Sequence, residues 1–281
     1  MSNFTIEAIR APVVGVFDSG FGGLTVLRAL AEKMPAARFV FLGDTARLPY
    51  GSKSQRTIAR YAAESARFLV EEQQAEYLVV ACNTASALAL DAIQASVAVP
   101  VLGVIEPGAE AAAQQTKTGD VMVIATEATV VSHAYASACR GHGLHGIEKA
   151  CPLLVPLVEE GWIEHPVTEQ VVRIYLEELE AEARAAGQNP DTLVLGCTHY
   201  PLLRGVLERS VPQGVKVIDS AEATARRAAA AMAERAGTCA VETDEPHIRC
   251  FATDSVAKFE RLGSRFLGRP VGTVELVDLG G

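Results

Sequence analysis

The sequence contains no apolar stretch long enough to cross a membrane as a helix, which takes about 20 consecutive residues. Basic residues are also scarce: 25 Lys and Arg stand against 34 Asp and Glu, for a formal net charge of -9. This balance argues against sequence-independent nucleic-acid binding, because such binding needs a basic face that releases counterions. The first residues, MSNFTIEAIRAP, lack the basic start and apolar run of a signal peptide. We therefore expect a cytoplasmic protein that binds neither membranes nor nucleic acid.

None of the six cysteines forms a C-x-x-C pair, which disfavours a structural zinc site, and we expect no metal. In a chain without a secretion signal, the cysteines are expected to be reduced thiols. Cys82 and Cys197 each end an apolar run and are followed by small polar residues. The other four lack this context and are expected to be structural: Cys139, Cys151, Cys239 and Cys250.

Short apolar, β-branched runs alternate with helical patterns along almost the whole chain. Near-continuous apolar strands indicate burial on both faces, and the alternation predicts parallel βαβ units. Strands are expected at Val13–Phe17, Phe39–Leu42, Tyr77–Ala81, Val99–Ile105, Val121–Ala125, Leu193–Gly196, Val215–Ile218, Ile248–Ala252 and Val274–Val277. Between them lie helical patterns such as Leu24–Glu32, Thr57–Glu72, Ala85–Ser96, Val167–Ala186 and Ala223–Arg235.

Two of the expected strand ends are similar, which indicates an internal duplication. One segment reads LVVACNT and ends at Thr84; the other reads LVLGCTH and ends at His199. Each is followed further on by a strand and an acidic residue, Glu106 in the first case and Asp219 in the second. The separation of the two cysteines far exceeds the period of about 20–50 residues typical of solenoids. Two related domains that face each other fit this pattern better.

The acid-containing segments, residues 103–108 and 216–222, are expected to be the crossings between these domains. We predict an α/β fold with two similar doubly wound parallel-sheet domains, related by pseudo-twofold symmetry, with the active site between them. The first domain would comprise residues 1–105 plus 219–281 and carry Cys82. The second would comprise residues 106–218 and carry Cys197.

Cys82 and Cys197 also have a plain structural interpretation, because a free cysteine is usually a small buried hydrophobe. Their position between a strand and a helix, however, favours the thiolate. Two thiols on facing domains suit the inversion of a carbon centre, which needs a base on one face and an acid on the other. A thiol of pKa about 8.5 is only a few per cent ionised at pH 7, so the expected working state shares one proton between two sulfurs.

The first expected strand ends in Asp18 and a glycine-rich turn, SGFGG, at residues 19–23. The turn fails the G-x-G-x-x-G spacing of dinucleotide sites, because Thr25 occupies the position of the third glycine. Backbone amides at such a helix start bind either phosphate or carboxylate groups. Asp18 is open to three interpretations: a helix cap, a partner for a substrate ammonium, or a group that acts on Cys82.

Six segments together resemble bacterial glutamate racemases, the pyridoxal-phosphate-independent enzymes of the aspartate/glutamate racemase superfamily. They are residues 17–23, 43–51, 81–85, 103–107, 155–159 and 195–201. Aspartate racemases of the superfamily typically carry Glu where His199 stands here, and His where Ser86 stands. Both positions favour glutamate as the substrate.

The resemblance implies cofactor-independent 1,1-proton transfer between L- and D-glutamate, supplying D-glutamate for peptidoglycan. Cys82 would then serve the D-glutamate face and Cys197 the L-glutamate face. Asp18, Glu159 and His199 would assist proton handling, with Glu160 as the alternative to Glu159. The implied substrate contacts are Asp18, Ser19, Tyr50, Gly51, Asn83, Thr84, Thr126, Thr198 and His199.

Two other functions remain open from the sequence. One is a racemase for another acidic amino acid, or a related isomerase with a cysteine pair. The other is a non-catalytic amino-acid-binding or regulatory protein, although such a protein has no need of two thiols. The sequence does not fix the oligomeric state, and a homodimer is left open.

Overall fold

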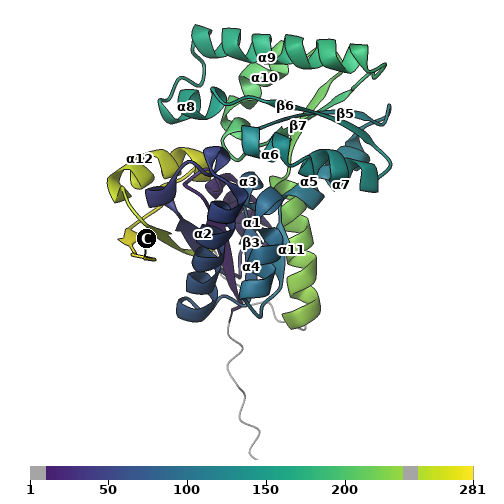
Figure 1. Ribbon diagram of the computed structural model, residues 1–281. Helices are drawn as coiled ribbons and strands as arrows, with labels where there is room; N and C mark the ends of the chain where they lie inside the picture. Colours follow the sequence, from purple (N-terminus) through teal and green to yellow (C-terminus); the bar gives the residue numbers. More distant parts are fainter. Residues whose placement is uncertain (1–10, 237–245, 281) are drawn as a thin grey trace, which may run out of the picture.

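The computed structural model describes residues 11–236 and 246–280. Cys239 and the first ten residues, on which two of the sequence expectations fall, lie outside the described residues. The described chain forms two parallel sheets, each covered by helices, one above the other in Figure 1. None of the helices in the described part of the chain has the length and apolarity needed to span a bilayer. The predicted α/β fold with two parallel sheets is confirmed.

The first sheet has six strands in the order β10-β9-β2-β1-β3-β4. Its strands are β1 (Val13–Asp18), β2 (Arg38–Gly43), β3 (Tyr77–Val80), β4 (Val101–Gly103), β9 (His247–Ala252) and β10 (Val274–Leu276). Around it lie α1 (Leu24–Lys33), α2 (Gln55–Arg67), α3 (Asn83–Leu88), α4 (Leu90–Ser96), α11 (Ala221–Ala236) and α12 (Val256–Leu267). Every residue of β1 and β3 is buried, which explains their continuous apolar sequence.

The second sheet has four strands in the order β6-β5-β7-β8. Its strands are β5 (Asp120–Ala125), β6 (His145–Ala150), β7 (Thr192–Gly196) and β8 (Lys216–Asp219). Its helices are α5 (Ile105–Gln115), α6 (Glu127–Val131), α7 (Ala134–Gly141), α8 (Leu154–Glu159), α9 (Pro166–Ala185) and α10 (Arg204–Ser210). Both sheets are parallel throughout, so their functional residues are expected at the carboxyl ends of the strands.

Three of the differences from the expected elements have a clear structural reason. β6 was not expected, because its sequence HGIEKA is polar and this edge strand has no fully buried residue. The expected strand at residues 99–105 is only three residues long, since Ile105 already begins α5. The helix expected at residues 85–96 starts earlier, at Asn83, and is interrupted at Ala89, whose backbone is not helical.

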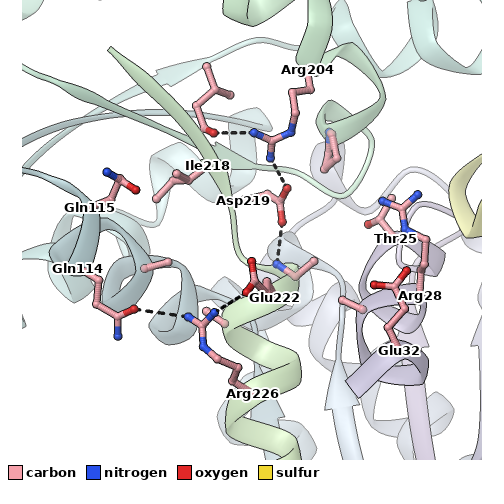
Figure 2. A pocket seen from close by; sticks show the side chains of 16 residues that line it. Thr25, Arg28, Glu32, Gln114, Gln115, Arg204, Ile218, Asp219, Glu222 and Arg226 are labelled. Carbon is pink, nitrogen blue, oxygen red and sulfur yellow. Dashed lines mark hydrogen bonds and ion pairs between the residues drawn. The ribbon is translucent and has the colours of Figure 1, made fainter. Parts of the chain in front are cut away.

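The chain passes between the sheets twice, from β4 into α5 and from β8 into α11. Figure 2 shows the second crossing. Arg204 donates hydrogen bonds to the Val217 carbonyl and to the Asp219 carboxylate, each at 2.5 Å, and Asp219 accepts the Ala221 N–H at 2.9 Å. A cavity of about 720 Å³ lies here between α1, α5 and α11. These contacts fix the crossing; the exact domain boundaries, 105/106 and 218/219, stay a prediction.

Candidate active site

A cavity of about 220 Å³ is lined by residues that follow strands of both sheets. Cys82 follows β3 of the first sheet, and Cys197 follows β7 of the second. Eleven of the residues singled out from the sequence line it: Ser19, Tyr50, Gly51, Cys82, Asn83, Thr84, Thr126, Glu159, Cys197, Thr198 and His199. The cavity thus brings both thiols together, while Cys139, Cys151 and Cys250 are buried away from it.

Cys82 is the N-cap residue of α3 and is only 5% exposed. Its Sγ accepts the Ala85 N–H and donates to the Ser19 hydroxyl, each at 3.4 Å. Burial and the nearby Asp18 carboxylate raise the pKa of the Cys82 thiol to about 11, although Ser19 and the amides of Ala85 and Ser19 lower it in part. The helix start therefore favours the thiolate as expected, but loss of solvation is the larger effect.

Cys197 lies in a similar environment and is 7% exposed. The backbone amides of His199 and Tyr200 favour its thiolate, but burial and the nearby Cys82 and Asp18 raise its pKa above the ordinary thiol range. It precedes a 3₁₀ turn, Tyr200–Leu203, rather than an α-helix. Burial therefore favours the protonated form of both thiols.

This protonation predicts slow alkylation of Cys82. At pH 7.5 a thiol of pKa about 11 has a thiolate fraction roughly 300-fold below that of a free cysteine. Because the thiolate is the reactive form and burial raises its pKa, the rate should rise about tenfold per pH unit between pH 8 and 10. Iodoacetamide labelling with peptide mass spectrometry measures this. Fast labelling at pH 7 that does not change with pH would show a resting thiolate instead.

Asp18, the last residue of β1, does not line the cavity. Its Oδ2 accepts the Gly20 N–H at 2.9 Å, which turns the side chain under the glycine-rich turn, and its Oδ1 is buried without a hydrogen-bond partner. Burial raises its pKa, opposed by His199 and nearby backbone amides. Of the three interpretations, its position beside both sulfurs favours an action on Cys82; direct contact with a substrate stays a prediction.

Hydroxyl and amide groups from both sheets meet across the cavity. Thr84, after β3, lies 3.0 Å from Thr126, after β5, measured between their Oγ1 atoms, and Thr126 lies 2.9 Å from Thr129. The Asn83 side-chain oxygen accepts a hydrogen bond from Tyr135 at 2.7 Å. These contacts tie the two halves of the cavity together and leave several donors along its wall.

His199 belongs to a chain of three charged or polar side chains. Its Nε2 lies 3.3 Å from Glu159 Oε1, and Glu159 Oε2 lies 2.9 Å from Lys258 Nζ. Burial alone would raise the pKa of Glu159, but His199 and Lys258 together hold it below its ordinary value. Glu160 is exposed and does not line the cavity, so the geometry favours Glu159 as the acid beside His199.

Several lining residues were not singled out from the sequence. They are Leu48, Pro49, Ser52, Glu127, Pro152, Val155 and Pro156. Leu48, Pro49, Val155 and Pro156 fall within the matching segments, whereas Ser52 and Glu127 carry no signal beyond following a turn or a strand. Conversely, Ser86 does not line the cavity: its hydroxyl donates to the Val80 carbonyl and accepts the Val104 N–H, bridging β3 to the residue after β4. Any effect of Ser86 on substrate choice is therefore indirect.

The wall of the cavity combines hydroxyl, amide and thiol groups with two carboxylates, those of Glu127 and Glu159, and one histidine. His199 is the one side chain among its lining residues that can carry a positive charge. Within residues 11–236 and 246–280, no group of three His, Cys, Asp or Glu side chains is placed to hold a metal ion. Proton transfer through the two thiols is the chemistry that these groups can perform by themselves.

Comparison with known proteins gives consistent matches. Residues 7–228 match the family model for Asp/Glu/hydantoin racemases. A glutamate racemase of Koribacter versatilis is 55% identical, and the alignment covers 97% of this chain and 99% of that protein. Glutamate racemase isoform RacE1 from Bacillus anthracis superposes with a TM-score of 0.86 at 37% identity, covering 96% and 98% of the two chains. A Francisella tularensis glutamate racemase in complex with D-glutamate has a TM-score of 0.84 at 34% identity, covering 96% and 98%.

Proposed function

Because the chain belongs to the Asp/Glu/hydantoin racemase family, we propose that it is a glutamate racemase that inverts the α-carbon with two cysteines. The observation that carries this proposal is the pair of thiols, Cys82 and Cys197, which reach one cavity from two different sheets. In this mechanism one sulfur removes the α-proton from one face of the substrate, and the other delivers a proton to the opposite face. Cys82 serves D-glutamate and Cys197 serves L-glutamate.

The proposed substrate fits the polarity of the wall. Glutamate has two carboxylates, which can accept hydrogen bonds from the hydroxyls of Ser19, Thr84, Thr126 and Thr198 and from the Asn83 amide. The ammonium requires an acceptor, which the Glu159 carboxylate can supply from the wall, while the buried Asp18 carboxylate behind the wall adds negative charge nearby. Recognition of this anion is therefore local, in a protein whose formal net charge is -9.

The substrate must also change the protonation of the sulfurs. Burial favours the neutral form of both thiols. A bound ammonium near a sulfur lowers its pKa by direct attraction, as any cation within about 4–6 Å does. One proton is then shared between two sulfurs, and the thiolate side depends on the enantiomer bound. Donors along the wall and exclusion of water stabilise the carbanionic transition state.

The proposal predicts cofactor-independent racemisation. The enzyme, exhaustively treated with EDTA and free of pyridoxal phosphate, should convert either enantiomer of glutamate to the racemate, followed by circular dichroism. Aspartate should react far more slowly, which also tests the alternative of another acidic amino acid. Loss of activity with EDTA, or a bound chromophore, would contradict the mechanism. Tight binding of glutamate without inversion would favour a binding protein.

The biological setting is part of the same proposal. D-Glutamate formed by the enzyme supplies peptidoglycan synthesis in the cytoplasm, where reduced thiols persist. We keep the homodimer as a proposal, tested by sedimentation of the purified protein with and without glutamate.

A further inference from the structure

Lys258 lies outside the catalytic cavity but contacts one of the residues that line it. It belongs to α12, which packs beside the first sheet, whereas Glu159 ends α8 beside the second. The ion pair between Lys258 Nζ and Glu159 Oε2, at 2.9 Å, therefore joins the two halves of the molecule. An isolated exposed ion pair contributes little stability, and Lys258 is 41% exposed. The importance of this pair lies instead in how it orients the Glu159 carboxylate.

The two oxygens of Glu159 have different partners. Oε2 faces Lys258, and Oε1 faces His199 Nε2 at 3.3 Å. Since an ionised carboxylate only accepts hydrogen bonds, His199 Nε2 must carry the hydrogen in this contact. A neutral imidazole with hydrogen on Nε2 has its free lone pair on Nδ1. Holding Glu159 in this orientation therefore also selects the tautomer and the ring orientation of His199.

Other residues of α12 limit the movement of the same ring. Phe266 of α12 lies edge-on to His199 with 5.1 Å between ring centroids, and Phe21 lies 5.8 Å away on a tilted plane. Arg265 of α12 lies against Gly161, just after α8, so closely that a Cβ at that glycine would be 2.8 Å from the guanidinium. Helix α12 thus contacts both His199 and the end of α8 that presents Glu159.

We propose that Lys258 is a positioning residue for the cysteine half-site on the second sheet: it orients Glu159, which in turn orients His199 beside Cys197. The backbone N–H of His199 faces the Cys197 sulfur, so the residue whose ring Glu159 holds is also in direct contact with this thiol. Cys82 makes its hydrogen bonds with Ser19 and the Ala85 amide, and His199 acts on it only through the Asp18 carboxylate. The effect of losing Lys258 should therefore be larger on the Cys197 side. This inference rests on the proposed function.

An elimination reaction measures the activity of each cysteine by itself, whereas racemisation requires both. An amino acid with a leaving group on its β-carbon loses its α-proton to the thiolate and expels the leaving group as an anion. The resulting enamino acid takes up water to give a 2-oxo acid and ammonium. Only one base is needed, so elimination from the L-analogue reports on Cys197 and elimination from the D-analogue on Cys82.

The test compares Lys258→Met with the wild type in the full-length enzyme. We expect elimination from the L-analogue to fall about tenfold, elimination from the D-analogue to change less than twofold, and glutamate racemisation to fall about tenfold in kcat with little change in KM. Lys258→Arg should restore most of the loss. The matched control is Lys149→Met, which breaks ion pairs with Glu178 and Glu182 on the outer side of the second sheet and should leave all rates unchanged.

The possible results test the role of Lys258 separately from the proposed function. Equal losses with both analogues, or a loss that Lys258→Arg does not restore, would indicate a purely structural role and overturn it. Unchanged rates in Lys258→Met would overturn it too. If the wild type itself fails to racemise glutamate, the proposed function fails. Circular dichroism of each variant checks that it is folded.

Discussion

Replacing either Cys82 or Cys197 with alanine should abolish racemisation, with a loss of at least about 10⁴-fold in kcat/KM. General acid–base groups typically contribute about 10²–10⁴-fold, and inversion needs a group on each face of the substrate. Neither side chain has a substitute, because the remaining thiols of the described chain, Cys139, Cys151 and Cys250, lie outside the cavity. Racemisation of L- and D-glutamate, followed by circular dichroism, measures the loss.

The two variants should differ in elimination even though both lose racemisation. Cys82→Ala should still eliminate from the L-analogue, and Cys197→Ala from the D-analogue, because each retains one base. This selectivity also shows that the variant is folded and binds its ligand. The matched control is Cys250→Ala, a buried thiol of the first sheet that does not line the cavity. Near-normal racemisation by either active-site variant would exclude the two-thiol mechanism; elimination of the same enantiomer by both would show that the faces are assigned wrongly.

Gly22→Ala should reduce activity by about 100-fold or more while the fold is kept. A Cβ at this position would lie 2.3 Å from Thr198 Oγ1 and 2.7 Å from His199 Nδ1. Thr198 can rotate away, but the His199 ring is held by Phe21, Phe266 and Glu159 and must be displaced. A misplacement of about 1 Å in a catalytic site can cost about 10²-fold in rate.

The control for this variant is Gly141→Ala, at the end of α7, where an added Cβ meets no atom within 4 Å. It should behave as the wild type. Steady-state kinetics with both enantiomers and a thermal unfolding curve for each variant complete the measurement. A Gly22→Ala enzyme with normal rates would mean that the contact between the glycine-rich turn and His199 opens at little cost during turnover.

Most of the strands that position this site could be predicted from the sequence, because their signals lie in short stretches of consecutive residues. A buried parallel strand must be apolar throughout, so the runs ending before Cys82 and Cys197 identify both strand ends without any tertiary information. By contrast, β6 is a polar edge strand and left no such pattern. The contact of Lys258 with Glu159 joins residues 99 positions apart, and no local pattern indicates such a pair.

The electrostatics of the thiols were the least accessible to sequence reasoning. A strand end before a helix correctly suggests amides that favour a thiolate, and such amides contact both sulfurs. The larger contribution is loss of solvation, which depends on how completely the other domain covers each cysteine. The same effect raises the pKa of Cys151 and Cys250 to about 12, so a shifted pKa does not by itself distinguish a catalytic thiol here. What distinguishes Cys82 and Cys197 from the other described thiols is that they line the shared cavity.

In the two-thiol mechanism two different groups serve the two faces of the α-carbon, and hydrogen isotopes distinguish this from a single base. Each enantiomer of glutamate is incubated with the enzyme in D₂O, and substrate and product are separated and analysed by mass spectrometry at low conversion. The two-thiol mechanism predicts one deuterium at the α-carbon of the product, delivered from a sulfur that has exchanged with solvent, while the recovered substrate keeps its hydrogen. Product that retains the substrate's own hydrogen, or recovered substrate that exchanges as fast as product forms, would indicate a single base and rule out the two-thiol mechanism.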